Sequence, residues 1–376
     1  MKILIVGGAG VQVQPAIDDL LQGDEFTQIV LGDINVEAAQ ALVAKRNNSK
    51  LSAIRLDAFD QAGMVNIMAN FDIVYNASGP YHLIGMRVLT AAIEAGKHYV
   101  DYCDDTGPTL EMLKLSDVAA EKDVCALIGM GVSPGYLNLM AKKTADRLDQ
   151  VEEINIYWSI SHGEPEGPAV IDHMCDILSG DARQFLNGEF TMVPSLSGAE
   201  EEVDMPTPFG RVNCAYVAHP EPSTLPLYIP GLKQVTNKYA TSLDEISFYQ
   251  GLAQLGLMDK TPVDVRGQMV SPRDLLVVHL MEAARQAEAA APENLISAAI
   301  LDVKGQISGN PTTIRLEIKG NMAPLTSLPA SMAARMLARG EIKERGVMPP
   351  EGCASVLVIA DAMNASGKVQ IEERML

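Results

Sequence analysis

The sequence predicts an α/β protein, with a doubly wound parallel sheet first and an α+β domain on a mixed, largely antiparallel sheet after it. Short apolar runs alternate with helical stretches up to about residue 130, which is the pattern of a parallel sheet. Later strands, such as Val151–Ser161, alternate apolar and polar residues, and Pro-rich turns separate them. A chain of 376 residues is also too long for one ordinary core. We therefore expect domains over 1–130 and 131–330, and a C-terminal segment, 331–376, that packs back towards the first domain.

The composition is that of a globular protein with a strongly acidic surface. Hydrophobic residues make up 47% of the chain, and the net charge is −19. Such a charge repels nucleic acid and anionic membranes, and no apolar run approaches membrane-spanning length. The five cysteines contain no C-x-x-C pair, and the histidines lack ligand spacing. We therefore expect a cytoplasmic protein that has no disulfides and no metal site and binds neither nucleic acid nor a membrane.

The first 33 residues form a strand, turn, helix, strand unit. Gly8 and Gly10 occupy the first two positions of a G-x-G-x-x-G loop, where missing side chains let a pyrophosphate approach the backbone amides. The second strand ends at Asp33, where a carboxylate accepts hydrogen bonds from the adenosine ribose. The unit predicts a dinucleotide site of Rossmann type. The alternative is a Gly-rich turn without a ligand.

Two departures from the motif lie at the first helix. Val13 stands where a third glycine lets the helix pack closely on the first strand, so we expect the helix to sit further out or enter at another angle. Pro15 lacks an amide hydrogen, which predicts a helix that is distorted there or starts late. Asp33 repels a ribose phosphate, and Ile34 and Asn35 bring no positive charge, so NAD is favoured, with NADP possible.

The rest of the first domain continues the alternation. The expected helices are Val36–Arg46, Met86–Gly96 and Leu110–Lys122. The expected strands are Leu51 to about Asp57, Ile73–Tyr75, Tyr99–Tyr102 and Val124–Ile128.

Ligands collect at the carboxyl ends of parallel strands, which fixes the expected coenzyme site. Asp57 and Ala58 lie beside the expected adenine pocket, and the loop Asn76–Pro80 beside the nicotinamide ribose, although this loop also has the composition of an ordinary turn. The predicted cofactor-binding residues are Gly8, Gly10, Val11, Gln12, Asp33, Ile34, Asp57, Ala58, Asn76, Ser78, Gly79 and Pro80.

For the rest of the chain, the sequence pattern predicts several helices and one antiparallel pair of strands. Helices are expected at Tyr136–Leu148, Asp244–Gly256, Pro272–Ala290 and Leu328–Arg339. Two antiparallel strands are expected at Ile296–Ile307 and Thr312–Lys319, with Gly309–Pro311 as their turn.

Four segments carry a resemblance to the saccharopine dehydrogenase-like family of amino-acid oxidoreductases. They are the GGAG unit with Asp33, NASGPYHLIGMRVLTAAIEAGKHYVDYCDD (Asn76–Asp105), GMGVSPGYLN (Gly129–Asn138) and LPASMAARMLARGEIKERGVMPPE (Leu328–Glu351). The resemblance implies a Rossmann domain with an inserted α+β domain for substrate binding and dimer contacts. It also implies NAD(P)-dependent oxidation of a carbon bearing an amino group, or reduction of an imine.

Candidate catalytic residues follow the fifth strand and the domain crossing. Asp104, and after it Asp105, would stabilise a substrate ammonium or iminium, although an Asp pair after a strand is often a helix cap. Tyr136 would donate a proton or order a water, or else pack at a hinge. His82 and His162 follow a loop and a strand and are more often structural.

Five residues are predicted to contact the substrate. Ser133 and Asn138 lie at the crossing between domains, where ligands often bind. Lys238 would hold a substrate carboxylate, although a lysine is usually solvated surface. The predicted set is Tyr81, Cys103, Ser133, Asn138 and Lys238.

The leading hypothesis is a cytoplasmic, homodimeric NAD(P)-dependent oxidoreductase acting on the CH–NH group of an amino acid or amino-acid adduct. The alternatives among enzymes are a carboxynorspermidine synthase-like imine reductase and a lysine 6-dehydrogenase. An alternative of another class is a dinucleotide-sensing or scaffold protein without turnover.

Overall fold

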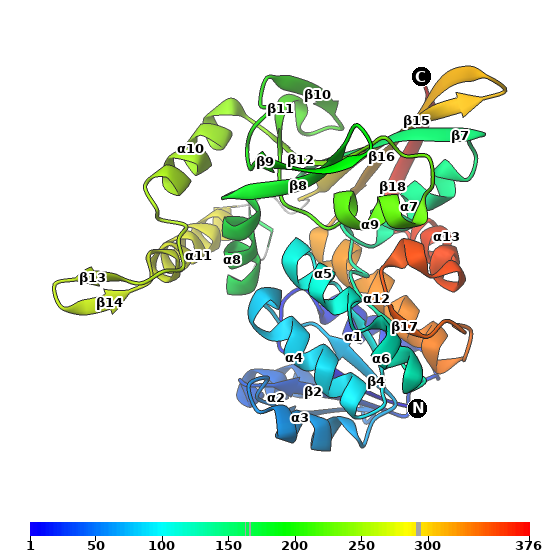
Figure 1. The fold of residues 1–376 in the computed structure, drawn as a ribbon. Coiled ribbons are helices and arrows are strands. Elements are labelled where there is room, and N and C mark those ends of the chain that lie inside the picture. Colours follow the sequence, from blue (N-terminus) through cyan, green and yellow to red (C-terminus); the bar gives the residue numbers. More distant parts are fainter. Residues whose placement is uncertain (162, 165–166, 291–294) are drawn as a thin grey trace. The chain divides into compact units, whose positions relative to one another are not determined.

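The computed structural model describes all residues except 162, 165–166 and 291–294, so His162 lies outside the described residues. It divides into two compact units, drawn in Figure 1. The first unit comprises Met1–Met140 and Ala323–Lys368, and the second comprises Ala141–Met322 and Val369–Leu376. The boundaries fall near residues 140 and 323, compared with the predicted 130 and 330.

The first unit is built on a seven-stranded parallel sheet, which confirms the predicted fold class. The strand order is β17-β6-β5-β4-β1-β2-β3, so the chain starts in the middle of the sheet and winds outwards in both directions. The strands are β1 (Lys2–Val6), β2 (Gln28–Asp33), β3 (Leu51–Arg55), β4 (Ile73–Asn76), β5 (His98–Asp101), β6 (Cys125–Leu127) and β17 (Gly346–Met348).

Helices cover both faces of this sheet. Consecutive residues of β1, such as Leu4 and Ile5, are both fully buried, as a two-sided parallel sheet requires. The helices are α1 (Gln14–Gln22), α2 (Val36–Arg46), α3 (Gln61–Met68), α4 (Tyr81–Glu94), α5 (Thr106–Leu113), α6 (Ser116–Glu121), α12 (Met322–Ala338) and α13 (Val358–Ala365), with α7 (Tyr136–Ala145) leading out of the unit.

Three local predictions in the first unit were wrong. The helix expected over Leu110–Lys122 is two helices, α5 and α6, because the chain bends at Leu115, which packs against the core. Helix α4 begins at Tyr81 rather than Met86, directly after Pro80 in extended conformation. Strand β17 was not predicted, because a strand of three residues is too short to show an alternation of apolar and polar residues.

The second unit contains a mixed, largely antiparallel sheet of nine strands, as predicted. Its main path is β10-β11-β12-β7-β15-β16-β18, and only the β12–β7 pair on that path is parallel. The strands are β7 (Gln150–Ser159), β8 (Asp181–Leu186), β9 (Glu189–Pro194), β10 (Glu201–Met205), β11 (Gly210–Tyr216), β12 (Gln234–Thr241), β15 (Ser297–Ile307), β16 (Asn310–Gly320) and β18 (Gln370–Met375).

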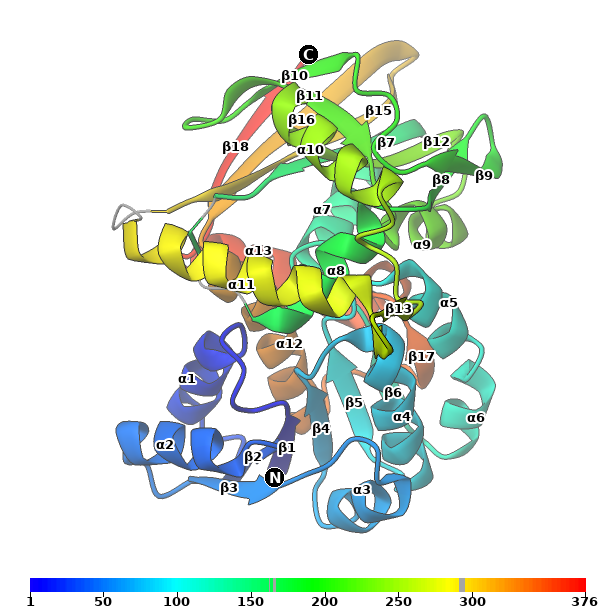
Figure 2. The same cartoon turned by 90° about the vertical axis from the view of Figure 1, so that its left-hand side faces the viewer.

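Two helices of the second unit form a long segment with a small hairpin between them. Figure 2 shows α10 (Leu243–Gln254), the β13 (Val263–Val265) and β14 (Gln268–Val270) hairpin, and α11 (Pro272–Ala290). The remaining helices are α8 (Pro168–Ile177) and α9 (Glu221–Tyr228), which the sequence pattern did not predict because they are short and Pro226 lies inside α9.

Two further expectations in the second unit need correction. The β15–β16 turn consists of Ser308 and Gly309, both with positive φ, and Asn310 already pairs with Ile307, so the turn lies before the predicted Gly309–Pro311. The C-terminal segment does not pack wholly with the first unit, because β18 pairs with β16. Within the described residues, no helix has the length and apolar character needed to cross a membrane.

Candidate active site

The glycine loop after β1 lies so close to its neighbours that side chains cannot fit. A Cβ on Gly8 would lie 2.7 Å from Cβ of Leu31, and one on Gly7 would lie 2.7 Å from Cα of Ser78. Gly7 also has a φ of +75°, and the amide of Gly10 donates to its carbonyl at 3.0 Å. The missing side chains therefore let the loop pack closely against β2 and the loop after β4, and Gly7, which was not predicted, is part of that arrangement.

Asp33, at the end of β2, faces this loop. One carboxylate oxygen accepts the amide of Ala9 at 2.9 Å, and the other accepts the amide of Asn35 at 2.9 Å. The carboxylate therefore stands beside the glycine loop, where a ribose hydroxyl would meet it. Asp57 instead accepts the amide of Phe59 in its own turn.

Helix α1 tolerates both departures from the motif. It begins at Gln14, and Pro15 lies in its first turn, where a proline costs no hydrogen bond. Val13 is the N-cap and is fully buried, and no side chain caps the helix. Helix α1 therefore starts late, as predicted, and Pro15 does not break it. Two of the predicted cofactor-binding residues are exposed: Val11, at 38%, precedes α1, and Ile34, at 55%, follows β2.

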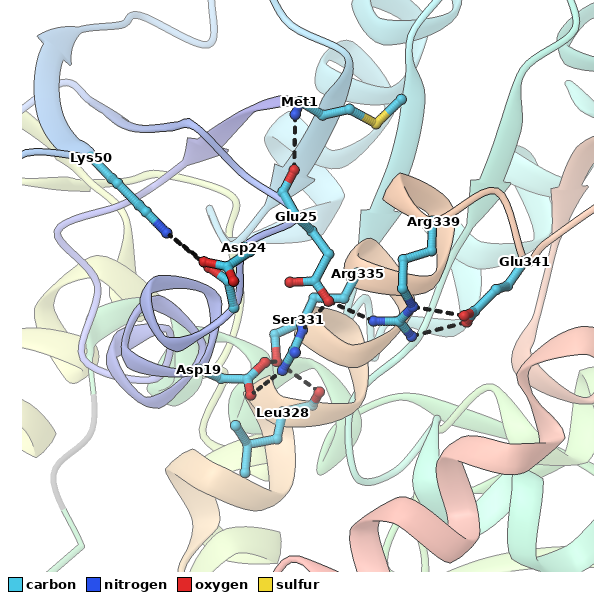
Figure 3. Close-up of polar contacts among 11 residues, drawn as sticks. Met1, Asp19, Asp24, Glu25, Lys50, Leu328, Ser331, Arg335, Arg339 and Glu341 are labelled. Carbon is cyan, nitrogen blue, oxygen red and sulfur yellow. Dashed lines mark hydrogen bonds and ion pairs between the residues drawn. The ribbon is translucent and has the colours of Figure 1, made fainter.

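A polar cluster fixes α1 against α12, as Figure 3 shows. Arg335 pairs with Asp19 of α1 at 3.1 Å and with Glu25 at 3.1 Å, and Arg339 reaches Glu25 at 2.7 Å. Burial raises the pKa of Glu25, but hydrogen bonds from its own backbone and from both arginines outweigh this and lower it. The C-terminal segment thus holds the helix that follows the glycine loop.

A buried carboxylate, Asp101, joins the carboxyl ends of three strands. Its Oδ1 accepts the amides of Cys103 at 3.0 Å and Gly129 at 2.7 Å, and its Oδ2 accepts the Tyr99 hydroxyl at 2.7 Å. That hydroxyl in turn accepts the side-chain amide of Asn76 at 3.0 Å. We call these five residues the Asp101 network; it binds the loops after β4, β5 and β6 to one another.

Burial dominates the electrostatics of this network. Asp101 is fully buried, and desolvation raises its pKa to about 6, against the hydrogen bonds from Cys103, Tyr99 and Gly129. Asp104 adds to the rise by repulsion. Burial likewise raises the pKa of the Cys103 thiol well above its usual range, which argues against a reactive thiolate.

The predicted acids lie directly beside this network. Asp105 is 6% exposed and is the N-cap of α5, but its side chain does not cap the helix amides. Its Oδ2 lies 4.0 Å from Nδ1 of His82, which comes from α4. Asp104 is half-buried between Cys103 and Asp105. The catalytic role of Asp104 and Asp105 stays a prediction, and the geometry places both at the carboxyl end of β5 as expected.

The other predicted residues of the first unit hold its loops together. The Tyr81 hydroxyl donates to the Asn76 carbonyl at 3.0 Å. Tyr136 is fully buried, and its hydroxyl bonds to Asn364. Asn138 accepts the Gly135 amide at 3.0 Å and donates to Glu351 at 3.0 Å. Their substrate and proton-transfer roles remain predictions.

Two further predicted residues, Ser78 and Ser133, lie in loops of the first unit. The amide of Ser78 donates to the side chain of Asn76 at 3.0 Å. The peptides Gly79–Pro80 and Ser133–Pro134 are both cis. Both loops follow strands of the parallel sheet at its carboxyl edge.

Lys238, predicted to hold a substrate carboxylate, lies on β12 in the second unit and is 4% exposed. Its ammonium pairs with Glu201 and lies over the rings of Tyr216, at 4.6 Å, and Tyr157, at 5.6 Å. A substrate carboxylate would have to compete with Glu201, so the structure gives this prediction no support.

Sequence models of known families cover both units. The saccharopine dehydrogenase NADP binding domain matches residues 3–127, and the saccharopine dehydrogenase C-terminal domain matches residues 131–367. The chain belongs to the saccharopine dehydrogenase family. The predicted resemblance is thereby confirmed.

Similar proteins agree with this membership. Carboxyaminopropylagmatine dehydrogenase of Synechocystis sp. is 24% identical over 372 residues, covering 93% of this chain and 92% of that protein. Apo saccharopine dehydrogenase (L-Glu forming) of Saccharomyces cerevisiae has the same fold, with a TM-score of 0.74 at 16% identity, covering 100% and 99% of the two chains. The DAP dehydrogenase of C. glutamicum gives a TM-score of 0.50 at 13% identity, covering 95% of each chain.

As a member of this family, the chain is an NAD(P)-dependent oxidoreductase that acts on the CH–NH group of a small molecule. The cradle formed by Gly7 and Gly8 and the carboxylate of Asp33 fit such a coenzyme. The bound coenzyme supplies or accepts the hydride.

Proposed function

We propose that this chain interconverts an imine and a secondary amine in which an amino-acid unit is joined to an amine. The supporting observation is the similarity to carboxyaminopropylagmatine dehydrogenase across 93% of this chain and 92% of that protein. In the reductive direction, the C=N carbon gains a hydride and the nitrogen gains a proton. At 24% identity, the adduct that this chain uses is to be identified with the substrate panel described below.

In this proposal the protein positions the reactants and handles charge. The backbone at Val11 and Gln12, where the glycine loop leads into α1, binds the pyrophosphate, and Asp33 binds the ribose hydroxyls. Because Asp33 places a negative charge at the ribose, we propose NAD as the preferred coenzyme, although the matching family domain is described as NADP binding.

Asp104 and Asp105 are proposed to stabilise the cationic nitrogen of the iminium or ammonium. Two carboxylates at the carboxyl end of β5 favour positive charge there, and the Asp101 network fixes the backbone that carries them. Tyr136 is the proposed alternative for proton transfer, but its bond to Asn364 makes it the weaker candidate.

Coenzyme absorbance with a substrate panel tests this function. The panel pairs amino acids bearing an aldehyde with simple amines and includes saccharopine and lysine for the other members of the family. We expect consumption of reduced coenzyme with an aldehyde–amine pair, and about a 100-fold loss of kcat in Asp104→Asn with coenzyme binding unchanged. Binding of coenzyme without turnover of any pair would instead support a dinucleotide sensor.

We further propose a homodimer and a cytoplasmic location. The segment from α10 to α11 in the second unit carries exposed apolar side chains, including Leu255 at 76% and Met269 at 69%, which a second copy would cover. The five cysteines are all free and buried, which suits a reducing compartment.

A further inference from the structure

A buried imidazole–carboxylate pair lies in the second unit, on two residues that the proposed function does not use. His219 is 4% exposed and Glu221 is fully buried, and Nδ1 of His219 lies 3.0 Å from Oε2 of Glu221. Pro220 stands between them and Pro222 follows, so the backbone that holds the pair at the start of α9 is stiff. The pair is therefore a fixed element of this unit.

Aromatic rings flank the imidazole. The ring of Trp158 lies 6.0 Å from that of His219, and the ring of His173 lies 5.6 Å away in an edge contact. Trp158 is itself fixed, since its Nε1 donates to Asn237 at 2.7 Å and its ring packs on Tyr239 at 4.7 Å. These aromatic side chains favour a cationic ligand, because aromatic faces attract positive charge.

Two buried hydroxyls of this region have no hydrogen-bond partner among the described residues. They are Oγ of Ser223 and Oγ1 of Thr224. Ser223 and Thr224 are each 1% exposed, and neither hydroxyl bonds back to the preceding turn of the chain. Buried polar groups without partners are costly and rare, so the two hydroxyls indicate that a ligand binds here.

The hydrogen bond to Glu221 determines what Nε2 can bind. When Nδ1–H donates to the carboxylate, the neutral ring presents a lone pair at Nε2, and the buried carboxylate favours positive charge next to it. The hydroxyls of Ser223 and Thr224 can accept as well. Together these atoms suit a group with several N–H donors and a positive charge.

We propose that His219, Ser223 and Thr224 bind the ammonium or guanidinium end of the substrate. This inference rests on the proposed function in one respect: the cation belongs to the amine half of the adduct. It assigns to the second unit the recognition of the amine partner, while the coenzyme site lies in the first.

Binding of simple cations to the full chain tests the inference. The probes are butylammonium and butylguanidinium, with valerate as an anion of similar length, each titrated by calorimetry with and without reduced coenzyme. We expect the cations to bind and valerate not to bind. Thr224→Val and His219→Gln should each weaken cation binding at least about tenfold, as loss of a hydrogen bond to a charged group does.

A stability measurement separates a ligand site from a structural role. Thr224→Val keeps the shape and removes an unpartnered buried hydroxyl, so its thermal midpoint should equal or exceed that of the unsubstituted protein. Thr191→Val on β9 and His279→Gln on the exposed side of α11 are the matched controls, and both should leave cation binding unchanged.

Two results would overturn the inference: valerate binding as tightly as the cations, or Thr224→Val and His219→Gln binding cations within twofold of the unsubstituted protein. Failure of the proposed function is a separate result, because cation binding is measured without turnover. Cation binding that depends on Thr224, in a protein that reduces no imine, would support this site and refute that function.

Discussion

At the scale of single residues, Asp101 holds together the loops of the candidate active site. Its carboxylate and carbonyl accept three backbone amides, those of Cys103, Gly129 and Met130, as well as the Tyr99 hydroxyl. Burial of a charge is costly, and the raised pKa of about 6 expresses that cost. At neutral pH the ionised Asp101 therefore destabilises the fold, while its hydrogen bonds fix the loops after β4, β5 and β6.

This predicts a pH dependence that Asp101→Asn removes. The unfolded carboxyl titrates at 3.8 and the folded one at about 6, so the folded state binds more protons between these values. The free energy of unfolding due to this group therefore falls as pH rises from about 4 to 6, by at most about 3 kcal/mol, and is constant above. Urea unfolding of both proteins at pH 4.5 and pH 7 measures it.

The comparison isolates Asp101 because other carboxylates, such as Glu25, contribute equally to both proteins. Glu25 has a lowered pKa, so its contribution has the opposite sign and is lost as pH falls. Relative to the unsubstituted protein, Asp101→Asn should gain stability between pH 4.5 and pH 7. Parallel pH profiles for the two proteins would show that Asp101 does not titrate in this range.

The sequence pattern located the strand that carries Asp101 but not the role of that residue. Three acids, Asp101, Asp104 and Asp105, lie near one strand end, and nothing in their spacing says which of them are buried. Burial of Asp101 depends on Gly129 and Asn76, which are distant in sequence. Contacts of this kind are not periodic, so a pattern cannot show them.

At the scale of elements, the long periodic segments were predictable and the short ones were not. Helix α2 has the predicted bounds, and β2 ends at Asp33 as predicted. In contrast, α9 was missed because Pro226 lies inside it, where a proline usually ends a helix. It carries Ser223 and Thr224, so the proposed cation site could not be predicted from the sequence.

The glycine loop provides a prediction at this scale. Gly8→Ala places a Cβ 2.7 Å from Leu31 of β2, so the loop must move and its amides lose their alignment. We expect at least a tenfold loss of coenzyme affinity, measured by fluorescence titration of the reduced coenzyme. Gly251→Ala on α10, where a Cβ meets nothing within 4 Å, is the control and should bind coenzyme normally. Normal coenzyme binding by Gly8→Ala would show that the glycine loop is not part of the coenzyme site.

At the scale of the whole molecule, we propose that the first unit binds the coenzyme and the second binds the substrate cation. The family match assigns coenzyme binding to residues 3–127, and the proposed cation site lies on α9 and β7 of the second unit. The sequence predicted this division into two sheets of different type because parallel and antiparallel strands bury different faces. It could not predict that β18 returns the chain end to the second sheet.

Oligomeric state gives a prediction at this scale. Leu255 and Met269, which are 76% and 69% exposed, lie on the α10–α11 segment proposed to contact a second copy. We expect light scattering after size exclusion to give twice the chain mass, and the double variant Leu255→Glu, Met269→Glu to give the single mass. Phe59→Glu, at a 62% exposed residue of the first unit, should leave the dimer intact. A monomeric unsubstituted protein would contradict the proposed dimer.

Titration of the protein with NADH and NADPH tests the central claim, that the glycine loop and Asp33 form the coenzyme site. The unsubstituted protein should bind NADH more tightly than NADPH. Asp33→Asn keeps an oxygen for the Ala9 amide and removes the negative charge, so it should lower the NADH preference at least about tenfold. An unsubstituted protein that binds neither coenzyme, or a variant with an unchanged preference, would contradict the claim.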